Sequence, residues 1–398
     1  PRYGQDKDRI IIVKKVAYDE LFDSLSIQVL SDQSPDMFEF TTKMFPYIAA
    51  NKMVQPIDDV VDMSDPVWDG YRELSEMIKY NGKMYCPVIQ YRVEDLWYYR
   101  KSVVKEAGLP DPAELFRKGE WDWDHMLGMA AAFQQTSTSD QKKYFVDGDY
   151  VQSSIMNSSG VPMIGMDDSG KAVNNMNDPR LESAARVLRE LCEHEYRYPF
   201  EANGNRTNMK EWIMGNTLFF VHGDWFWEDI NNQGISFQFT RGRLEPDDIG
   251  CVPAPKNPDL KDHPCNYDLF GYALCAGSDN YDSYNAWNQC NMIAHKDKKI
   301  NEEDKKQRFE NYQWTEEVWH MIWEEFEDPV VSPLTPVFDF AYGISEDGVH
   351  DTTGLTPMDM IMKKPYIDMK YSPYEVARDE NNNIINTYIE KINSGITQ

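Results

Sequence analysis

The sequence predicts a two-lobed α/β protein in which each lobe is a β-sheet flanked by helices. Its length of 398 residues exceeds a usual single hydrophobic core, so two domains are expected. Residues 84–89 and 96–99 are apolar, extended runs, and polar residues separate them. Asn81 and Gly82 precede the first run and form a two-residue turn of the kind that closes a hairpin. Two strands with a polar bend between them are typical of a chain that crosses from one domain to another.

Charge and hydropathy exclude some partners. The chain has 40 basic and 67 acidic side chains, and its net charge of -27 repels phosphate backbones and anionic lipids. We therefore expect no nucleic-acid partner. No apolar run approaches the ~20 residues that span a bilayer. No signal peptide begins the sequence, which leaves either a cytosolic protein or an exported one whose leader is not included.

A β-α-β unit is expected at the start of the chain. Residues 10–16 are a β-branched run, residues 19–30 have helical spacing of their apolar side chains, and residues 36–40 are strand-like. Residues 68–79 are weakly helical.

Helices are predicted to dominate the middle of the chain. They cover residues 113–118, 122–135, 180–195 and 209–214. Asp122 and Asp178 are expected to cap the second and third of these helices, and Gly215 to end the last one. A buried strand over residues 217–222 follows, and an aromatic cluster comes directly after it: Trp225, Phe226 and Trp227.

The last third of the chain is predicted to return to the first domain. Strands are expected over residues 249–255 and 267–276, and a helix starts after Ser278. One long helix is expected over residues 307–326, in which Trp319 and Trp323 form an i, i+4 pair. The proline-rich and aromatic residues 330–342 are predicted to be a loop in the cleft or a hinge, and a helix covers residues 382–392.

Short motifs follow one another along the chain in a recognisable order. Asn81, Gly82, Lys83, Tyr85 and Pro87 form N-G-K-x-Y-x-x-P, and the loosely matching second motif is made by Leu96, Tyr98 and Arg100. Further motifs lie at residues 34–37, 49–59, 106–112, 119–123, 215–225 and 270–274. Their order and spacing resemble the extracellular solute-binding proteins of family 1, the sugar receptors of ABC importers that include maltose-binding protein. That family usually has Asn at the position of Tyr99.

The resemblance implies a periplasmic-binding-protein-like fold of type II, with a ligand cleft between the lobes. Lobe one is expected to contain residues 1–92 and 268–328, and lobe two residues 93–267 and 329–398. In the resembled family the central strand of the first sheet and its helix come before the β-α-β unit. We therefore expect an N-terminal segment to precede this sequence.

The resemblance also implies a function. It predicts a receptor, with no catalytic residues and no cofactor, that captures a carbohydrate such as an oligosaccharide and delivers it to the membrane permease of an ABC importer. Such a receptor is expected to be a monomer. It is also expected to be extracellular, either as a cell-surface lipoprotein or in the periplasm.

Ligand-binding residues are expected just after strands, because ligands of open α/β sheets bind outside the carboxyl ends of the strands. Trp225 is favoured because the Trp of the G-x-W motif stacks on the ligand in the resembled family. Its alternative is a place in the core, which is the commoner fate of large aromatic side chains. The predicted ligand-binding residues are Glu39, Phe40, Lys43, Gln90, Tyr91, Tyr150, Gln152, Trp225, Asp268 and Phe270.

A glycoside hydrolase is the alternative function, because such an enzyme needs two carboxylates ~5 to 10 Å apart beside aromatic platforms. The candidate carboxylates are Glu94, Asp95, Asp224, Glu228 and Asp229. Each has an ordinary alternative as a helix cap or a solvated charge. The sequence has no H-E-x-x-H, G-x-S-x-G, Walker or G-x-G-x-x-G motif. A cytosolic acidic scaffold is a third possibility, but it does not explain the ordered motifs.

The six cysteines have no C-x-x-C spacing, and the seven histidines show no ligand spacing, so no metal is expected. Cys251 and Cys265 flank a proline-rich loop and could pair if the protein is exported.

Overall fold

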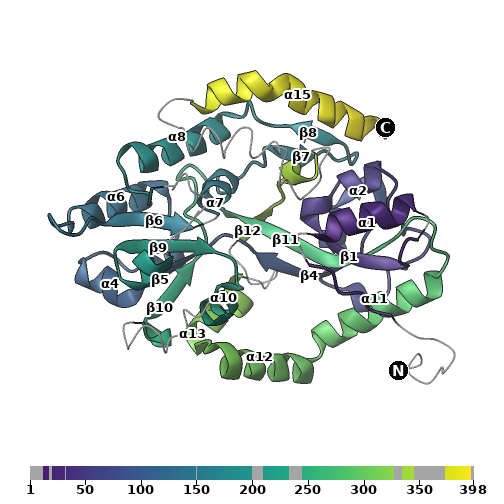
Figure 1. The fold of residues 1–398 in the computed structure, drawn as a ribbon, viewed down its shortest axis with the longest axis horizontal. Helices are drawn as coiled ribbons and strands as arrows, with labels where there is room; N and C mark the ends of the chain where they lie inside the picture. Colours follow the sequence, from purple (N-terminus) through teal and green to yellow (C-terminus); the bar gives the residue numbers. More distant parts are fainter. Residues whose placement is uncertain are drawn as a thin grey trace.

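The computed structural model describes residues 12–17, 20–31, 33–148, 150–199, 209–232, 244–326, 334–344 and 373–395. The described residues form two four-stranded sheets in different regions of the molecule, and helices flank both (Figure 1). Two hairpins add short sheets of their own: β2 (Lys79–Tyr80) with β3 (Lys83–Met84), and β7 (Ile164–Met166) with β8 (Ala172–Asn174). None of the described helices is both long enough and apolar enough to cross a membrane.

The first sheet is organised around β11 (His263–Leu274). β1 (Met37–Thr41) and β4 (Val88–Val93) pair with it antiparallel, and β12 (Leu334–Val337) pairs parallel with its first residues. Each part of β11 therefore has a neighbouring strand, which supplies the backbone hydrogen bonds that so long a strand requires.

The second sheet has the strand order β10 (Ile249–Val252), β5 (Leu96–Arg100), β9 (Thr217–His222) and β6 (Tyr144–Gly148). β9 is antiparallel to β5 and parallel to β6. Every residue of β9 is buried, as its continuous apolar run predicts for a strand covered on both faces.

The chain passes between the two sheets where β4 ends and β5 begins. Glu94 and Asp95 form this crossover, and Asp95 has a φ of 62°, a left-handed conformation in which Asp is enriched among non-glycine residues. The amide of Glu94 donates a hydrogen bond of 3.0 Å to the carbonyl of Asn266 on β11. The crossover is thus fixed against the central strand of the first sheet.

Several helices begin and end as their sequences predict. The side chain of Asp122 accepts a hydrogen bond of 2.9 Å from the amide of His125 and caps α6 (Trp123–Gln134). Asp178 caps α8 (Pro179–Glu193) in the same way through the amide of Arg180. The other α-helices of the described residues are α1 (Leu21–Leu30), α2 (Tyr47–Ala50), α3 (Arg72–Glu76), α4 (Lys101–Glu106), α5 (Pro112–Arg117), α7 (Val151–Asn157), α9 (Met209–Ile213), α10 (Phe226–Asn232), α11 (Tyr281–Lys296), α12 (Lys298–Tyr312), α13 (Glu316–Trp319) and α15 (Tyr374–Ser394).

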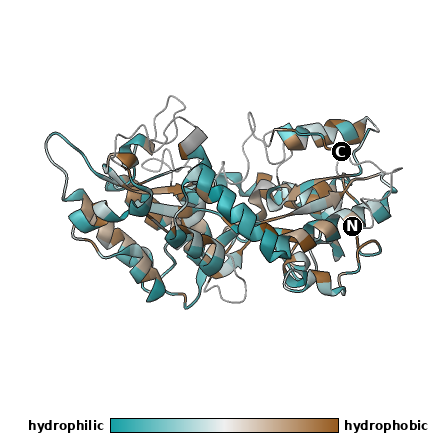
Figure 2. Ribbon diagram, turned by 90° about the horizontal axis from the view of Figure 1, so that it is seen from below, coloured by the Kyte–Doolittle hydropathy of each residue, from teal (hydrophilic) through white to brown (hydrophobic). Residues whose placement is uncertain are grey.

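Hydrophobic residues concentrate in the strands and on the inner sides of the helices (Figure 2). A large core cluster includes side chains of both main sheets, among them Phe40, Tyr91, Trp97 and Phe219. A smaller cluster with Trp68 and Tyr284 lies between α11 and the first sheet. α12 has no buried residue.

The predicted strand over residues 10–16 is wrong for the part that the structure describes. Residues 12–17 have no regular secondary structure, and Ile12 is 83% exposed. A β-branched sequence forms a strand only where a neighbouring strand can accept and donate its hydrogen bonds. The following helix and strand are present as α1 and β1, so this part of the β-α-β prediction is confirmed.

The predicted single helix over residues 307–326 is also wrong. α12 ends at Tyr312, because Gln313 adopts a φ of 57°, and the side chain of Thr315 caps the new helix α13. A π-helix, His320–Phe326, continues from it. The predicted pairing within this segment is confirmed, since the rings of Trp319 and Trp323 stack with centroids 5.3 Å apart.

The tail contains more structure than the predicted loop. Part of it forms β12 and a short 3-10 helix, Phe340–Tyr342, while residues 330–333 lie outside the described part of the chain. The predicted terminal helix is present within α15, which packs against β8, α8 and α2. Asn393 exchanges two hydrogen bonds of 2.8 Å with the backbone of Ala172 on β8.

Candidate ligand-binding site at the crossover

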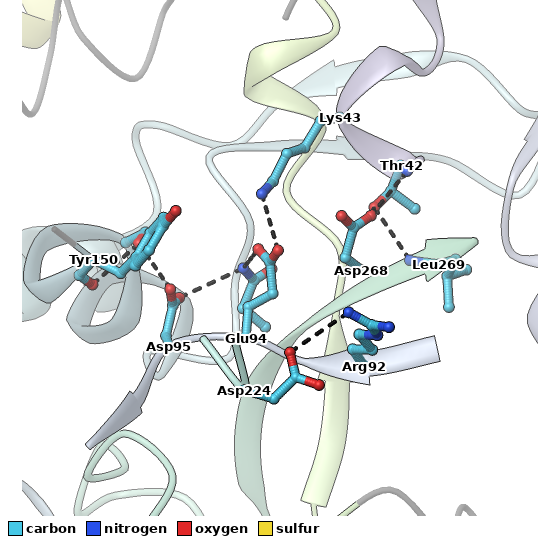
Figure 3. Close-up of polar contacts among 11 residues, drawn as sticks. Thr42, Lys43, Arg92, Glu94, Asp95, Tyr150, Asp224, Asp268 and Leu269 are labelled. Atoms are coloured by element: carbon cyan, nitrogen blue, oxygen red, sulfur yellow. Dashed lines mark hydrogen bonds and ion pairs between the residues drawn. The ribbon is translucent and has the colours of Figure 1, made fainter. Parts of the chain in front are cut away.

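The crossover gathers acidic side chains and one lysine in a buried environment (Figure 3). Glu94 pairs with Lys43, which follows β1, through an Nζ to Oε1 distance of 2.9 Å. The side-chain amide of Asn266 donates to Glu94 Oε2 at 3.3 Å and to Asp95 Oδ2 at 3.5 Å. Three segments that are distant in sequence therefore meet here through charged and polar groups.

Asp95 connects the crossover to α7. The hydroxyl of Ser153 donates a hydrogen bond of 3.3 Å to Asp95 Oδ1. Burial raises the pKa of Asp95 well above its usual range, and the neighbouring charge of Glu94 raises it further. The protonated form of Asp95 is therefore favoured, and this form can donate as well as accept a hydrogen bond.

Asp268 lies beside this group on β11. Its Oδ1 accepts hydrogen bonds from the amide of Thr42, at 3.0 Å, and from the Thr42 hydroxyl. Burial, followed by the charge of Glu94, raises the pKa of Asp268 to about 6, while Lys43 and the Thr42 hydrogen bonds act in the opposite direction.

One face of the first sheet continues the polar group. In the antiparallel register Gln90 lies opposite Phe270, and Arg92 lies opposite Asp268. Directly opposed residues of an antiparallel pair project to the same face of the sheet. The guanidinium of Arg92 accordingly lies over the ring of Phe270, 5.4 Å from its centroid. Gln90, Arg92, Asp268 and Phe270 thus form a mixed polar and aromatic face.

Residues after β9 approach this face from the second sheet. Asp224 Oδ1 lies 3.6 Å from Arg92 Nη1, and the carboxylate of Asp224 is only 2% exposed. Glu228 is nearby on α10; burial raises its pKa, the charges of Arg308 and Arg92 lower it, and that of Asp224 raises it. Arg92 and Asp224 therefore form a charged contact between the two sheets.

An aromatic group lies next to the acidic one. The half-buried ring of Trp225 contacts the rings of His222, at 5.3 Å between centroids, and Tyr150, at 5.9 Å. A Cβ on Gly223 would lie about 2 Å from atoms of the Trp225 indole, so the indole rests directly on this glycine. Phe226 and Trp227 are fully buried in the core. Of the three aromatic residues after β9, Trp225 alone keeps an exposed surface.

The structure brings together most of the predicted site residues. Lys43, Gln90, Asp268 and Phe270 lie on or beside the polar face of the first sheet, and Tyr150 and Trp225 lie in the aromatic group. Gln152 on α7 is buried, and its Oε1 accepts no hydrogen bond within the described part of the chain. Glu39 is exposed and lies opposite Tyr272, farther along β1.

Phe40 and Tyr91 are placed differently. Phe40 is completely buried against Phe45, and Tyr91 stacks on Tyr267 with ring centroids 5.9 Å apart. Successive residues of a strand project to opposite faces, so Phe40 and Tyr91 point away from the face that carries Gln90. In this structure both residues support the sheet from its core side.

Several polar residues of this site were not among the predicted ligand-binding residues. The sequence signal that could have found some of them is the polar alternation of Gln90, Arg92 and Glu94 along and just after β4. The others come from separate segments and have no common local signal. The additional residues are Thr42, Arg92, Glu94, Asp95, Ser153, His222, Asp224 and Asn266.

The described residues contain no group of three or more His, Cys, Asp or Glu side chains that could hold a metal ion.

Cys251 and Cys265 do not form a disulfide bond in the structure. Both are buried free thiols, as are Cys86 and Cys275.

Two sheets joined at a crossover, with polar and aromatic side chains gathered beside it, define a two-lobed α/β binding fold. The chain belongs to the bacterial extracellular solute-binding proteins, whose family model matches residues 2–287. The predicted family is thereby confirmed, and this family consists of receptors. No curated protein sequence matches the chain.

Solved structures share the fold at low sequence identity. The GacH receptor of Streptomyces glaucescens, solved unliganded and with acarbose, is 14% identical, with a TM-score of 0.63 over 98% of this chain and 92% of that one. A transporter-associated binding protein of B. animalis subsp. lactis, in complex with β-1,6-galactobiose, is 13% identical, with a TM-score of 0.62 over 100% and 95%. UgpB from Mycobacterium tuberculosis, in complex with glycerophosphocholine, is 16% identical, with a TM-score of 0.60 over 98% and 93%. The predicted fold class is confirmed.

Proposed function

We propose that this protein is the substrate-binding receptor of an ABC importer and that it captures a carbohydrate between its lobes. The observation that carries the proposal is the half-buried Trp225 indole beside buried carboxyl groups at the crossover. An aromatic ring can cover the apolar C–H face of a sugar, and carboxylates accept hydrogen bonds from its hydroxyls. A site that combines both groups suits a ligand with one apolar face and a polar rim.

The structural relatives support a carbohydrate as the ligand. The GacH receptor and the B. animalis protein were solved with acarbose and with β-1,6-galactobiose. UgpB was solved with glycerophosphocholine, which is a polar ligand of another class. We favour a sugar for this chain because acidic groups outnumber basic ones around the crossover, and a phosphodiester would be repelled there.

The proposed site has two parts. The first part is the mixed polar and aromatic face beside the crossover, with Lys43, Gln90, Glu94, Asp268 and Phe270, and Glu39 at its margin. The second part is the aromatic group of Tyr150 and Trp225, with Gln152 on α7 beside it. We propose that lobe one comprises residues 1–92 and 268–328 and lobe two residues 93–267 and 329–398. We also propose that the receptor is a monomer and releases its ligand to a membrane permease. It is either anchored to the cell surface as a lipoprotein or retained in the periplasm.

A thermal-shift panel tests this function directly. Maltotetraose, acarbose, β-1,6-galactobiose and glycerophosphocholine are titrated against the purified protein, and each glycan is then analysed by mass spectrometry. A receptor should gain stability with at least one sugar, since binding to the folded state raises its melting temperature, and leave that sugar intact. Cleavage of the glycan would identify a hydrolase. A shift with glycerophosphocholine alone would overturn carbohydrate binding.

Trp225 gives the test of the site itself. Its replacement by Ala should weaken binding of the responsive sugar by at least tenfold, about 1.4 kcal/mol, because the stacking surface is lost. The melting temperature without sugar should change little, since the indole keeps an exposed surface and lies at the edge of the core. Unchanged affinity would remove Trp225 from the site.

A further inference from the structure

Arg92 and Asp224 form an incomplete ion pair between the two sheets. Arg92 lies on β4 of the first sheet, and Asp224 follows β9 of the second. Their closest charged atoms, Nη1 and Oδ1, are 3.6 Å apart, which is longer than a good hydrogen bond. Arg100, on β5 of the second sheet, and Asp248, which directly precedes β10 of the same sheet, form a complete ion pair by contrast. Their Nε and Oδ2 atoms are 2.9 Å apart.

Each member of the pair also has a buried polar atom with no partner. Within the described part of the chain, Arg92 Nε donates to no acceptor and Asp224 Oδ2 accepts from no donor. Buried polar groups are almost always hydrogen-bonded, because leaving one unpaired costs free energy. The two atoms offer complementary chemistry, one donor and one charged acceptor, at the same contact between the lobes.

The surroundings determine which ligand group would satisfy both atoms. The ring of Phe270 lies under the guanidinium at 5.4 Å, so one side of the contact is apolar. Glu228 is close enough for the charges of Asp224 and Arg92 to affect its pKa, and its own cationic neighbour Arg308 is 3.9 Å away. Asp224 faces the guanidinium of Arg92, and Glu228 lies between Arg92 and Arg308, so no unbalanced positive charge favours an anionic ligand group, whereas an uncharged hydroxyl can pair with either atom.

We propose that Arg92 and Asp224 are specificity-determining residues that together bind two adjacent hydroxyls of a sugar ring, with Phe270 against the ring. One hydroxyl accepts from Arg92 Nε, and its neighbour donates to Asp224 Oδ2. This inference rests on the proposed carbohydrate-binding function. Because the residues come from different lobes, a ligand diol held by both also joins the lobes.

The test is a set of titrations with the sugar that responds in the thermal-shift panel, whether maltotetraose, acarbose or β-1,6-galactobiose, and with the monodeoxy analogues of that sugar. Arg92→Met keeps the apolar stem of the side chain and removes the guanidinium, and Asp224→Asn keeps the shape and removes the charge. Each variant should bind the parent sugar at least tenfold more weakly. One deoxy analogue should bind the wild-type protein as weakly as Arg92→Met binds the parent sugar and should lose nothing further in that variant. A second analogue, which lacks the neighbouring hydroxyl, should behave in the same way with Asp224→Asn.

Arg100→Met is the matched control, because it breaks a complete pair at a distance from this contact and should leave sugar affinity unchanged. Circular dichroism establishes that each variant is folded, and either Arg92→Met or Asp224→Asn alone suffices for the comparison. Unchanged affinity in the variants would overturn the inference, as would an equal loss for the parent sugar and every deoxy analogue. A wild-type protein that binds none of the three sugars of the panel would instead overturn the proposed function, and this inference with it.

Discussion

The backbone amide of Asn81 donates a hydrogen bond of 3.0 Å to the carbonyl of Gly170. Asn81 is at the tip of the β2–β3 hairpin, and Gly170 is in the turn between β7 and β8, so two hairpins from different parts of the chain meet tip to tip. The hydroxyl of Tyr80 reaches the carbonyl of Ile392 near the end of α15 beside them. This contact joins segments that we assign to opposite lobes, at a place separate from the crossover.

Replacing Gly170 by Ala should weaken this contact. The residue has a φ of 75°, and an added Cβ would lie 3.0 Å from the backbone nitrogen of Asn81 and 3.0 Å from the carbonyl oxygen of Lys79. The left-handed conformation costs an L-residue about 1 kcal/mol, and displacement of the hydrogen bond adds about 1 kcal/mol. Urea unfolding should therefore show a loss of about 2 kcal/mol.

Gly108→Ala is the control for that measurement. Gly108 has a φ of 67°, but nothing lies within 4 Å of its added Cβ. The free energy of unfolding of Gly108→Ala should fall only by the cost of the left-handed conformation, about 1 kcal/mol. Equal losses in the two variants would show that the hairpin contact contributes nothing.

Gly223→Ala should affect ligand binding through Trp225. The added Cβ would meet ring atoms of Trp225 at 1.9 to 2.3 Å, so the indole must leave its present position. We expect the affinity for the responsive sugar to fall at least tenfold, about 1.4 kcal/mol, as in Trp225→Ala. Gly128→Ala on α6 has open space around its Cβ and should bind the sugar normally. Normal binding by Gly223→Ala would mean that the indole position does not matter.

The sequence was sufficient to predict the elements with strong local signals. The strands on both sides of the crossover follow from their apolar runs, and Asp122 and Asp178 cap their helices because the carboxylates reach the free amides of the first turn. The prediction of a strand over residues 10–16 was wrong for the described residues, because strand formation depends on a neighbouring strand. The break at Gln313 depends on a left-handed residue that no glycine marks.

The sequence predicted only those site residues that lie at the end of a single, recognisable strand. Strand ends indicated Gln90, Asp268 and Trp225, but choosing consecutive residues such as Gln90 and Tyr91 ignored the alternation of faces. Asp224 and Arg92 meet only because two sheets pack together. No spacing along the chain encodes that distance, so their contact required the structure.

Cys290 should be the first cysteine to react with a thiol reagent. It is exposed, whereas Cys86, Cys251, Cys265 and Cys275 are buried free thiols whose burial also raises their pKa. Titration of the native protein should label Cys290 first and the half-buried Cys192 more slowly, with the four buried thiols following after denaturation. Cys290→Ser should abolish the fast phase. Two fewer reactive thiols in the denatured, unreduced protein would instead reveal a disulfide.

The buried carboxyl of Asp268 should make the protein less stable as the pH rises from about 4 to about 6. Its pKa is about 6 in the folded protein and near 3.8 in the unfolded chain, so the folded state binds more protons in this range. Deprotonation therefore favours unfolding. The difference of about two pKa units corresponds to a loss of about 3 kcal/mol in the free energy of unfolding. This loss is complete once the pH exceeds the pKa of Asp268 in the folded protein.

Asp268→Asn should remove most of this pH dependence. The amide oxygen can still accept both hydrogen bonds from Thr42, and no charge is buried beside Glu94 at neutral pH. Urea unfolding at a series of pH values from 4 to 8 should show the variant as stable as the wild type near pH 4 and more stable at pH 7. Parallel curves for the two proteins would show that Asp268 does not titrate in this range, and that Asp95 or another buried acid controls any slope that remains.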